Sequence, residues 1–427
     1  MKVLVIGGGG REHALVWKIR QSRLVHELFC SPGNAGIAEI ADCPPLAASD
    51  CDAVADFVER QNIDLTVIGP EVPLAEGLVD RIHAAGGVAF GPMAAAARLE
   101  SSKAFAKEFM DRHQIPTAKY GVFGSYDDAI DYAKAQSYPL VVKADGLAAG
   151  KGVIIAADFE QARDALHTIM KSKAFGSAGD RVVIEECLEG PEASFFAITD
   201  GRQVIPLVTS QDFKRAYDDD QGPNTGGMGA FSPARYLDRT LTAEVLERIV
   251  APTIRGMAQE GNEYRGMLYV GLMLTADGPK VLEYNCRFGD PETQVVLPRL
   301  ATDIVPMLMA SAKGDLSSVR VEWKKQAAAC VVISAAGYPG SYAKGKKISG
   351  LDTIPRSDEV IVFHAGTRAG PGGDIRTAGG RVLGITALGR TIADARQRAY
   401  ETIDKIDFAG MHYRRDIALE AATTAGS

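Results

Sequence analysis

Cysteine is scarce in this sequence, positive charge is not in excess, and long apolar runs are absent. The six cysteines form no CxxC pair, and several lie within apolar runs such as VVIEECL. We therefore expect buried thiols in a cytoplasmic protein, without a disulfide framework or a zinc site. No apolar run approaches the ~18 residues that span a bilayer, and the first residues resemble a strand rather than a signal peptide. The net charge of −7 and the scattered basic residues argue against nucleic acid as the main partner.

Residues 1–100 alternate strand-like apolar runs with helical patterns, which is typical of a parallel sheet with helices on both faces. The expected strands lie at 2–6, 26–30, 63–69 and 87–90, and the expected helices at 11–22, 50–61 and 74–85. Ligands bind such sheets at the carboxyl ends of the strands. We therefore expect the loops GGGG, SPGNAG and GPEVP, which follow three of these strands, to meet at one site.

Beyond residue 100 the pattern changes, because tight turns now join the strands. Hairpins are expected in PLVVKADGLAAGKGVIIA, around TDGR, and in GMLYVGLMLTADGPKVLEYN. Helices are expected near 99–113, 241–260, 291–300, 303–313 and 391–406. A third pattern of strands with one or two helices begins near residue 327. The sequence therefore predicts a multidomain protein that combines α/β and α+β folds.

The glycine run at 7–10 follows the first expected strand and opens a helix. The dinucleotide-binding fingerprint needs G-x-G-x-x-G, but the sixth position counted from Gly7 is Glu12, and from Gly8 it is His13. The fingerprint also needs an acid at the end of the second strand, where the sequence is FCSP. What remains is a glycine loop at a helix N-terminus, which offers N–H groups to an anion. A tight turn without a ligand is the alternative.

The stretch KADGLAAGKGV resembles a P-loop but departs from it. Gly146 and Gly150 enclose three residues, and Lys151 is followed by Gly152 rather than by Ser or Thr. A glycine-rich hairpin of this kind can close over a triphosphate, and Lys143 on the incoming strand would then face phosphate oxygens. An ordinary glycine hairpin is the alternative.

The stretch KVLEYNCRFGDPE gathers polar groups at the end of an expected strand. Glu283 and Asn285 are two residues apart and so share one face. A carboxylate beside an amide oxygen suits Mg²⁺, which is usually shared with substrate phosphates. Arg287, Asp290 and Glu292 follow, and the Arg287 guanidinium can form two parallel hydrogen bonds to a carboxylate or a phosphate. A salt-bridged strand end is the alternative.

The stretch QDFKRAYDDDQGPNTGGMGA combines charge with glycine. Its acidic triplet at 218–220 predicts a solvated loop. Its glycines, Gly226 and Gly227, lie beside Thr225, which predicts a backbone in close contact with a small ligand.

Together these motifs resemble those of the ATP-grasp carboxylate–amine ligases, and within them the glycinamide ribonucleotide synthetase family. The most specific is RFGDPETQ at 287–294, and VIGGGGREHAL, SPGNAG, KADGLAAGKGV and NTGGMGA match in order and spacing. The C-terminal ALEAATTAGS matches nothing and is expected to be disordered. The resemblance implies a Rossmann-like N-terminal domain at 1–100, an ATP-grasp domain at 101–326 with a lid-like subdomain at about 117–190, and a small mixed C-terminal domain at 327–427.

The resemblance also implies a reaction. ATP would drive the ligation of glycine to 5-phosphoribosylamine through glycyl phosphate, giving glycinamide ribonucleotide, ADP and phosphate in de novo purine biosynthesis. Mg²⁺, with Mn²⁺ as a substitute, would be the cofactor and ATP a co-substrate. The partners would be small molecules, with no nucleic acid and no membrane, and the enzyme would be a cytoplasmic monomer or homodimer.

The motifs and the resemblance together imply four sets of site residues. Catalytic roles fall to Lys143, Arg287 and Asp290, and the metal to Glu283 and Asn285. ATP would contact Lys103, Lys143, Gly150, Lys151, Gly152, Glu185, Glu186, Leu188 and Glu192, with the 185–188 backbone at adenine and Glu192 at the ribose. Glycine and the amine would contact Gly9, Gly10, Arg11, Asn34, Glu71, Lys214, Thr225, Gly226, Gly227, Met228 and Arg287.

Two other functions stay open on the sequence alone. One is a purine-pathway ATP-grasp ligase that activates formate or bicarbonate, and RFGDPE counts against it. The other is a nucleotide-sensing or dinucleotide-binding protein without ligase activity, and the broken fingerprint and the Glu283–Asn285 pair count against that. The sequence assigns no role to His13, His364, Arg381 or the YRRD segment at 413–416.

Overall fold

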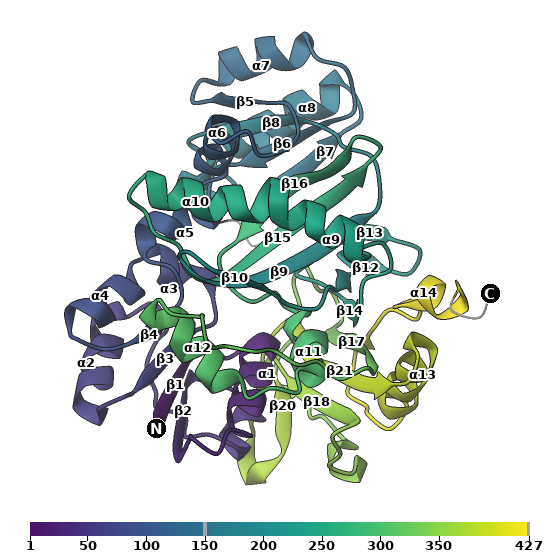
Figure 1. The fold of residues 1–427 in the computed structure, drawn as a ribbon. Helices are drawn as coiled ribbons and strands as arrows, with labels where there is room; N and C mark the ends of the chain where they lie inside the picture. Colours follow the sequence, from purple (N-terminus) through teal and green to yellow (C-terminus); the bar gives the residue numbers. More distant parts are fainter. Residues whose placement is uncertain (148–151, 425–427) are drawn as a thin grey trace.

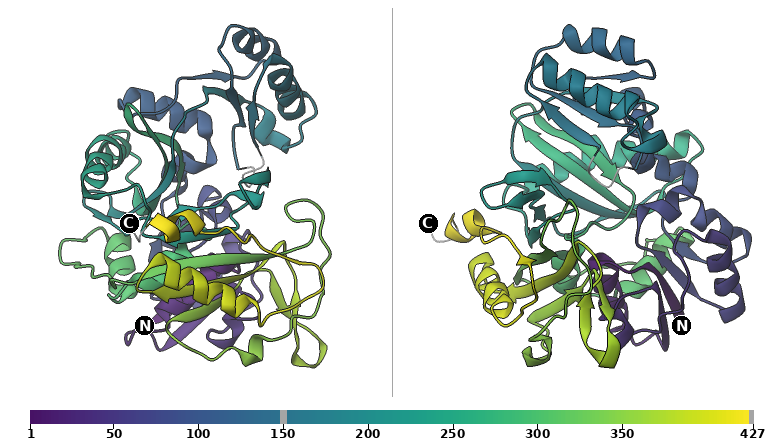
Figure 2. Two further views of the ribbon diagram at one scale, coloured as in Figure 1. Left: turned by 90° about the vertical axis from the view of Figure 1, so that its right-hand side faces the viewer. Right: turned by 180° about the vertical axis from the view of Figure 1, so that it is seen from behind.

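The protein is described here by a computed structural model that covers residues 1–147 and 152–424 (Figure 1). The N-terminal and C-terminal parts lie side by side, and two further sheets from the middle of the chain stack above them (Figures 1 and 2). Within the described ranges, no helix is both long and apolar enough to cross a membrane.

The N-terminal sheet is parallel, as the alternating pattern predicts. Its strand order is β2-β1-β3-β4. The strands are β1 (Lys2–Gly7), β2 (Glu27–Pro32), β3 (Leu65–Ile68) and β4 (Ala89–Phe90), and the helices between them include α1 (Gly10–Ile19), α2 (Cys51–Gln61) and α4 (Leu78–Ala84). Because the strands run the same way, the glycine loop after β1 and the loops after β2 and β3 open at one edge of the sheet.

Two helices expected as single elements are each divided in two. The expected helix at 74–85 is α3 (Glu71–Ala75) and α4, separated by Gly77, whose φ of 84° is a left-handed conformation that glycine adopts readily. The expected helix at 99–113 is α5 (Ala94–Ser101) and α6 (Lys103–Arg112). Ser102 between them has an extended backbone, and its hydroxyl accepts a hydrogen bond from the Phe105 N–H as the N-cap of α6. The apolar pattern continues across both breaks, which is why periodicity alone missed them.

The upper sheet in Figure 1 is small and antiparallel, in the order β5-β8-β6-β7. The strands are β5 (Tyr120–Phe123), β6 (Leu140–Ala144), β7 (Val153–Ala156) and β8 (Val182–Glu186), and α7 (Tyr126–Lys134) and α8 (Phe159–Leu166) pack on them. The pairing of β6 with β7 confirms the hairpin expected around KADGLAAGKGV.

The larger central sheet has the order β10-β9-β15-β16 and confirms the other two hairpins. The strands are β9 (Glu192–Asp200), β10 (Val204–Pro206), β15 (Arg265–Thr275) and β16 (Gly278–Asn285). Helices α9 (Arg239–Val245) and α10 (Ala251–Gln259), joined by a short π-helical turn at 246–250, form the expected helix at 241–260, and α11 (Thr293–Val296) and α12 (Ile304–Lys313) lie in the two expected later helices. Successive strand residues face opposite sides of the sheet, so Phe195 joins the core that contains α10, and Phe196 joins the core that contains α12.

The C-terminal sheet includes strands from earlier in the chain. Its order is β11-β14-β17-β21-β18, with β22 also paired to β17. The strands are β11 (Gln211–Asp212), β14 (Gly229–Ser232), β17 (Ala327–Ala335), β18 (Val360–His364), β21 (Arg381–Gly389) and β22 (Met411–His412), and α13 (Ile392–Ile403) covers one face. The expectation of a disordered tail is wrong for residues Leu419–Thr424, which form α14. The sheet therefore ties the NTGGMGA segment, which runs into β14, to the C-terminal part of the chain.

Candidate active site

The three N-terminal loops meet as expected. The Gly33 N–H donates to the Gly7 carbonyl at 3.1 Å, and the Asn34 side-chain amide donates to the Gly8 carbonyl at 2.9 Å. From the third loop, a Glu71 carboxylate oxygen lies 4.0 Å from Nη1 of Arg11. The carboxyl edge of the parallel sheet thus brings together glycine backbone, an arginine and a carboxylate.

This edge borders a cavity of about 480 Å³, which residues of the β5-β8-β6-β7 sheet and of the β10-β9-β15-β16 sheet also line. Most of the residues that the sequence assigned to the site line it: Arg11, Glu71, Lys103, Lys143, Gly152, Glu185, Glu186, Leu188, Glu192, Lys214, Thr225, Gly226, Glu283, Asn285, Arg287 and Asp290. The described lining does not include Gly9, Gly10, Asn34, Gly227 or Met228, and Gly150 and Lys151 fall outside the described residues.

One side of the cavity, hereafter the lysine side, carries the ammonium groups of Lys103, Lys107 and Lys143. Nζ of Lys143 lies 2.9 Å and Nζ of Lys107 lies 3.0 Å from the buried Glu185 carboxylate. Nζ of Lys103 donates to the Gly146 carbonyl at 3.0 Å. Burial lowers the pKa of Lys107 to about 8 and also lowers the pKa of Lys103. One carboxylate shared by two lysines leaves positive charge that an anionic ligand can neutralise.

Glu283 and Asn285 face the lysine side from β16. A β-bulge between Val281 and Glu283 interrupts the pairing of β16 with β15, and the Leu282 carbonyl within it accepts a hydrogen bond from Nζ of Lys143 at 3.2 Å. Burial alone would raise the pKa of Glu283, but nearby cations, Lys214 and Lys103 first among them, hold it below its usual value.

A second part of the cavity lining, hereafter the arginine side, contains Arg11, Arg287 and Arg381. Nη2 of Arg287 lies 2.9 Å from Glu100, and its Nε lies 3.3 Å from Glu71. Burial raises the pKa of Glu100 despite this contact, whereas the attraction of Arg287 and Arg11 outweighs burial at Glu71 and lowers its pKa. Arg287 is therefore held between two carboxylates while its guanidinium faces the cavity.

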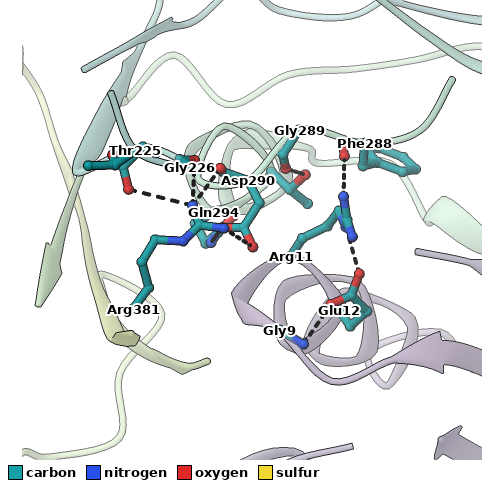
Figure 3. A network of polar contacts seen from close by, with 12 residues as sticks. Gly9, Arg11, Glu12, Thr225, Gly226, Phe288, Gly289, Asp290, Gln294 and Arg381 are labelled. Carbon is teal, nitrogen blue, oxygen red and sulfur yellow. Dashed lines mark hydrogen bonds and ion pairs between the residues drawn. The ribbon is translucent and has the colours of Figure 1, made fainter. Parts of the chain in front are cut away.

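Asp290 lies at the N-terminus of α1, where the sequence predicted an anion (Figure 3). Its carboxylate accepts hydrogen bonds from the Arg11 backbone N–H and, at 2.7 Å, from Nε2 of Gln294. The neighbouring Gly9 N–H donates to the Glu12 carboxylate at 2.6 Å. Burial would raise the pKa of Asp290, but Arg381 and Arg11 lower it, so the group is ionised. In this structure the anions at the helix N-terminus are the protein's own carboxylates.

Asn34 holds loops together. Its amide donates to the carbonyls of Gly8 and His364, and its oxygen accepts from the N–H groups of Gly36 and Ile37. These contacts use both donors and both lone pairs of the side chain. The predicted substrate contact of Asn34 stays a prediction. The His364 segment also bonds to His13, whose Nδ1 accepts the His364 N–H at 2.8 Å.

A group of acidic residues borders the cavity near β9 and β11. Nζ of Lys214 lies 2.8 Å from Glu192, and the Tyr269 hydroxyl donates to the buried Glu292 at 2.7 Å. Burial raises the pKa of Asp212 to about 7, although Lys214 opposes the shift. Two of the residues that the sequence assigned to the site therefore pair with each other, and cavity residues that it did not assign surround them.

The lining also includes polar residues that the sequence analysis did not assign to the site, among them Glu100, Lys107, Asp212, Tyr269, Glu292 and Arg381. Lys107 could have been predicted from the helical pattern, because it lies four residues after Lys103 and so shares its face of α6. Arg381 could not have been predicted in this way, since its partners Gly226 and Asp290 are 155 and 91 residues away in the chain.

Three family models together match most of this chain. They are described as the phosphoribosylglycinamide synthetase N domain at residues 1–100, its ATP-grasp (A) domain at 101–293 and its C domain at 328–420. The chain belongs to this family. The enzyme is a phosphoribosylamine–glycine ligase, which uses ATP to ligate glycine to phosphoribosylamine in purine biosynthesis.

Relatives of this ligase resemble it over their whole lengths. The phosphoribosylamine–glycine ligase of Caldanaerobacter subterraneus subsp. tengcongensis is 47% identical over 98% of this chain and 99% of its own. That of Escherichia coli O157:H7 is 50% identical over 99% of both chains. The crystal structure of the Thermotoga maritima enzyme superposes with a TM-score of 0.87 at 36% identity, covering 98% of this chain and 100% of its own.

A biotin carboxylase from Campylobacter jejuni shares the fold alone. It is 17% identical, with a TM-score of 0.76 over 96% of this chain and 93% of its own. The expected combination of a Rossmann-like N-terminal part, an ATP-grasp centre and a mixed C-terminal part is therefore confirmed. The acid that the ligase joins to the amine is glycine, not the formate or bicarbonate of the alternative function.

Proposed function

We propose that the ligase binds ATP on the lysine side of the cavity and joins glycine to phosphoribosylamine on the arginine side. The observation that carries this proposal is the Glu283–Asn285 pair. Both side chains face the cavity, and neither makes a hydrogen bond to another side chain in the described part of the protein. A pair of oxygen ligands left unpartnered among lysines suits a cation shared with a polyphosphate.

Adenine would lie where β8 ends. The pairing of β8 with its neighbours stops at Glu186, so the backbone groups of Cys187 and Leu188 lie beyond the sheet and can bond to the base. Val141, Met273 and Leu282 supply apolar walls nearby. Glu192, which is half exposed beside Lys214, would accept hydrogen bonds from the ribose hydroxyls.

The triphosphate would then extend over Lys103 and Lys143. Each ammonium keeps donors beyond those used in its contacts with Gly146, Glu185 and Leu282. Gly152 borders the same space, and the predicted contacts of Gly150 and Lys151 with ATP stay predictions.

Glu283 and Asn285 would hold Mg²⁺, with Mn²⁺ as the alternative that the same oxygen ligands accept. Within the described residues, no group of three or more His, Cys, Asp or Glu side chains is placed to hold a metal by itself. This fits a cation bound by two protein side chains together with ligand phosphates. When bound, the cation would neutralise charge on the transferred phosphoryl group.

The chemistry needs no covalent nucleophile from the protein. A glycine carboxylate oxygen attacks the γ-phosphorus of ATP, the bond to ADP breaks, and glycyl phosphate forms. The amine nitrogen of phosphoribosylamine then attacks the glycyl carbonyl, expels phosphate and loses a proton. Lys143 and Arg287 would stabilise the negative charge that develops in the first step.

The acceptor half of the cavity would be formed by the N-terminal loops and the NTGGMGA loop. Arg11 and Glu71 face it from the first, and Thr225 and Gly226 from the second, with Lys214 of the preceding segment beside Thr225. Asp290, which is ionised and held by three donors, would act by positioning these loops. Gly9, Gly10, Gly227 and Met228 would support the lining from behind.

Two broader assignments accompany this proposal. The domain boundaries at residues 100 and 326 are proposed from the sequence, with the lid-like subdomain at about 117–190 formed by the β5-β8-β6-β7 sheet. We also infer a cytoplasmic enzyme that is a monomer or a homodimer.

A titration with a non-hydrolysable ATP analogue tests the site. We expect Mg²⁺ to strengthen nucleotide binding to the wild type, and Glu283→Gln to lose this increase while metal-free binding persists. Asp277→Asn, at the exposed turn of the same hairpin, is the matched control and should behave as the wild type. A Glu283→Gln protein with the full Mg²⁺ effect would contradict the metal assignment. Repeating the titration with Mn²⁺ tests the alternative cation.

A further inference from the structure

Arg381 is the first residue of β21, in the C-terminal sheet, yet its side chain reaches the cavity (Figure 3). Among the described lining residues, it is the one that comes from the chain after residue 292. The C-terminal part of the ligase therefore contributes a single cation to a site that is otherwise built from the first 292 residues.

The Arg381 guanidinium joins two loops of the acceptor half. Nη1 donates to the Gly226 carbonyl at 2.6 Å and to the Asp290 carbonyl at 2.7 Å, and Nη2 lies 3.1 Å from the Asp290 carboxylate. A rigid planar fork can satisfy a carbonyl in one loop together with a carbonyl and a carboxylate in another, which an ammonium cannot do in the same geometry.

The NTGGMGA loop fits closely against this guanidinium. A Cβ atom added to Gly226 would lie 3.1 Å from Cζ of Arg381, closer than most such contacts. The Gly226 N–H donates to the Tyr338 hydroxyl at 3.0 Å, so residues of the C-terminal part contact this glycine at both its N–H and its carbonyl. Gly227 packs against Pro291, where an added Cβ would lie 2.4 Å from the ring. The two loops are thus in contact, and Arg381 bonds to both.

We propose that Arg381 is a positioning residue for the second half of the reaction. It fixes the Gly226–Gly227 loop against the Asp290–Pro291 turn, and so sets where phosphoribosylamine lies relative to glycyl phosphate. This inference rests on the proposed placement of ATP on the lysine side. Misplacing a reacting group by about 1 Å can cost about 100-fold in rate, so loss of Arg381 should impair amide formation more than ATP binding.

The coupling of ATP use to product formation provides the most specific readout. When the amine is misplaced, water can attack the glycyl carbonyl of glycyl phosphate and release glycine and phosphate. We expect Arg381→Met to raise the ratio of ADP to glycinamide ribonucleotide above the wild-type value of one that the reaction requires. We also expect it to lower kcat/KM for phosphoribosylamine by about 10- to 100-fold, with KM for ATP unchanged.

Three further variants make the test decisive. Arg381→Lys retains the charge beside Asp290 but not the fork, so its defect should be smaller than that of Arg381→Met. Arg376→Met removes an arginine of the same C-terminal part that bonds to Asp374 and Gly345 outside the cavity, and it should retain wild-type coupling. Gly226→Ala perturbs the same contact with Arg381 in place, so it should raise the ratio to a smaller extent even if Arg381→Met does not fold.

Two outcomes would overturn the proposal. One is wild-type coupling in folded Arg381→Met or, if that variant does not fold, in Gly226→Ala. The other is an Arg381→Met defect confined to KM for ATP. Lys143→Met is measured in parallel to test the proposed ATP site by itself. An unchanged KM for ATP in this variant would contradict the placement of ATP on the lysine side. The ratio of ADP to product in Arg381→Met tests the role of Arg381 independently of that result.

Discussion

The two sides of the cavity carry similar numbers of cations but use them differently. On the lysine side, Lys107 and Lys143 share one carboxylate, Glu185, and Lys103 contacts a backbone carbonyl. On the arginine side, Arg11 pairs with Glu12, Arg287 with Glu71 and Glu100, and Arg381 with Asp290. Lysine charge is left unmatched, whereas the arginine charges are matched by carboxylates of the protein.

This difference indicates that the lysines are available to bind a ligand anion, whereas the arginines mainly hold parts of the protein together. An unmatched, partly desolvated ammonium gains from a ligand anion, and the lowered pKa of Lys107 and Lys103 reflects the cost of their burial. A guanidinium held between carboxylates already has its counter-charge and cannot be removed without leaving buried charge behind. We therefore expect substitutions on the lysine side to affect ATP use, and those on the arginine side to affect stability or alignment, in addition to the charge stabilisation proposed above for Arg287.

The largest effect is expected from Arg287→Met. Removing this guanidinium leaves Glu71 and Glu100 without their shared partner, and breaking a buried ion pair from one side costs about 3–5 kcal/mol. Urea unfolding of the ligand-free protein should show this loss. Lys103→Met is the matched control because it leaves no carboxylate without its ion-pair partner, and its free energy of unfolding should stay close to that of the wild type. Equal losses in both variants would remove the distinction between the two sides.

A smaller effect is expected from Lys143→Met. This change removes a donor to phosphate but leaves Glu185 paired with Lys107, so the fold should persist. A charge-assisted hydrogen bond is worth about 1.5–3 kcal/mol, which corresponds to a loss of about 10- to 100-fold in kcat/KM for ATP. Steady-state kinetics with ATP varied would measure it. If kcat/KM for phosphoribosylamine fell alone, Lys143 would belong to the acceptor half.

The smallest effect is a pH dependence set by Lys107. Its pKa is lowered from 10.5 to about 8, so the folded protein loses this charge as pH rises through about 8. Glu185 is then matched by Lys143 alone, and KM for ATP should rise above pH 8. The unfolded chain holds the proton up to about 10.5, so the contribution of Lys107 to stability increases between these two values. Lys107→Arg should flatten the KM profile, and an unchanged profile would count against this role.

The lysine side could largely be predicted from the sequence, because local patterns place its residues. Glu283 and Asn285 alternate on one strand, and Lys143 precedes a glycine hairpin that the structure confirms. Even the missed Lys107 lies one helical turn from Lys103. Strand and helix periodicity are local properties, so they can be inferred from a single sequence.

The arginine side could be predicted only in part, because its contacts join distant segments. RFGDPETQ indicated a site, but nothing local indicates that Asp290 lies at the N-terminus of α1 or that Arg381 contacts Gly226. The helix breaks at Gly77 and Ser102 were not predicted for a different reason, because the apolar pattern continues across both of them. Long-range contacts of this kind follow from the packing of whole sheets.

One titration tests the separation of the two sides most directly. A non-hydrolysable ATP analogue with Mg²⁺ is added to Lys143→Met and to Arg381→Met, and the dissociation constants are compared with that of the wild type by calorimetry. The account predicts that Lys143→Met weakens nucleotide binding by at least about tenfold while Arg381→Met leaves it unchanged. Equal weakening in the two variants would contradict it.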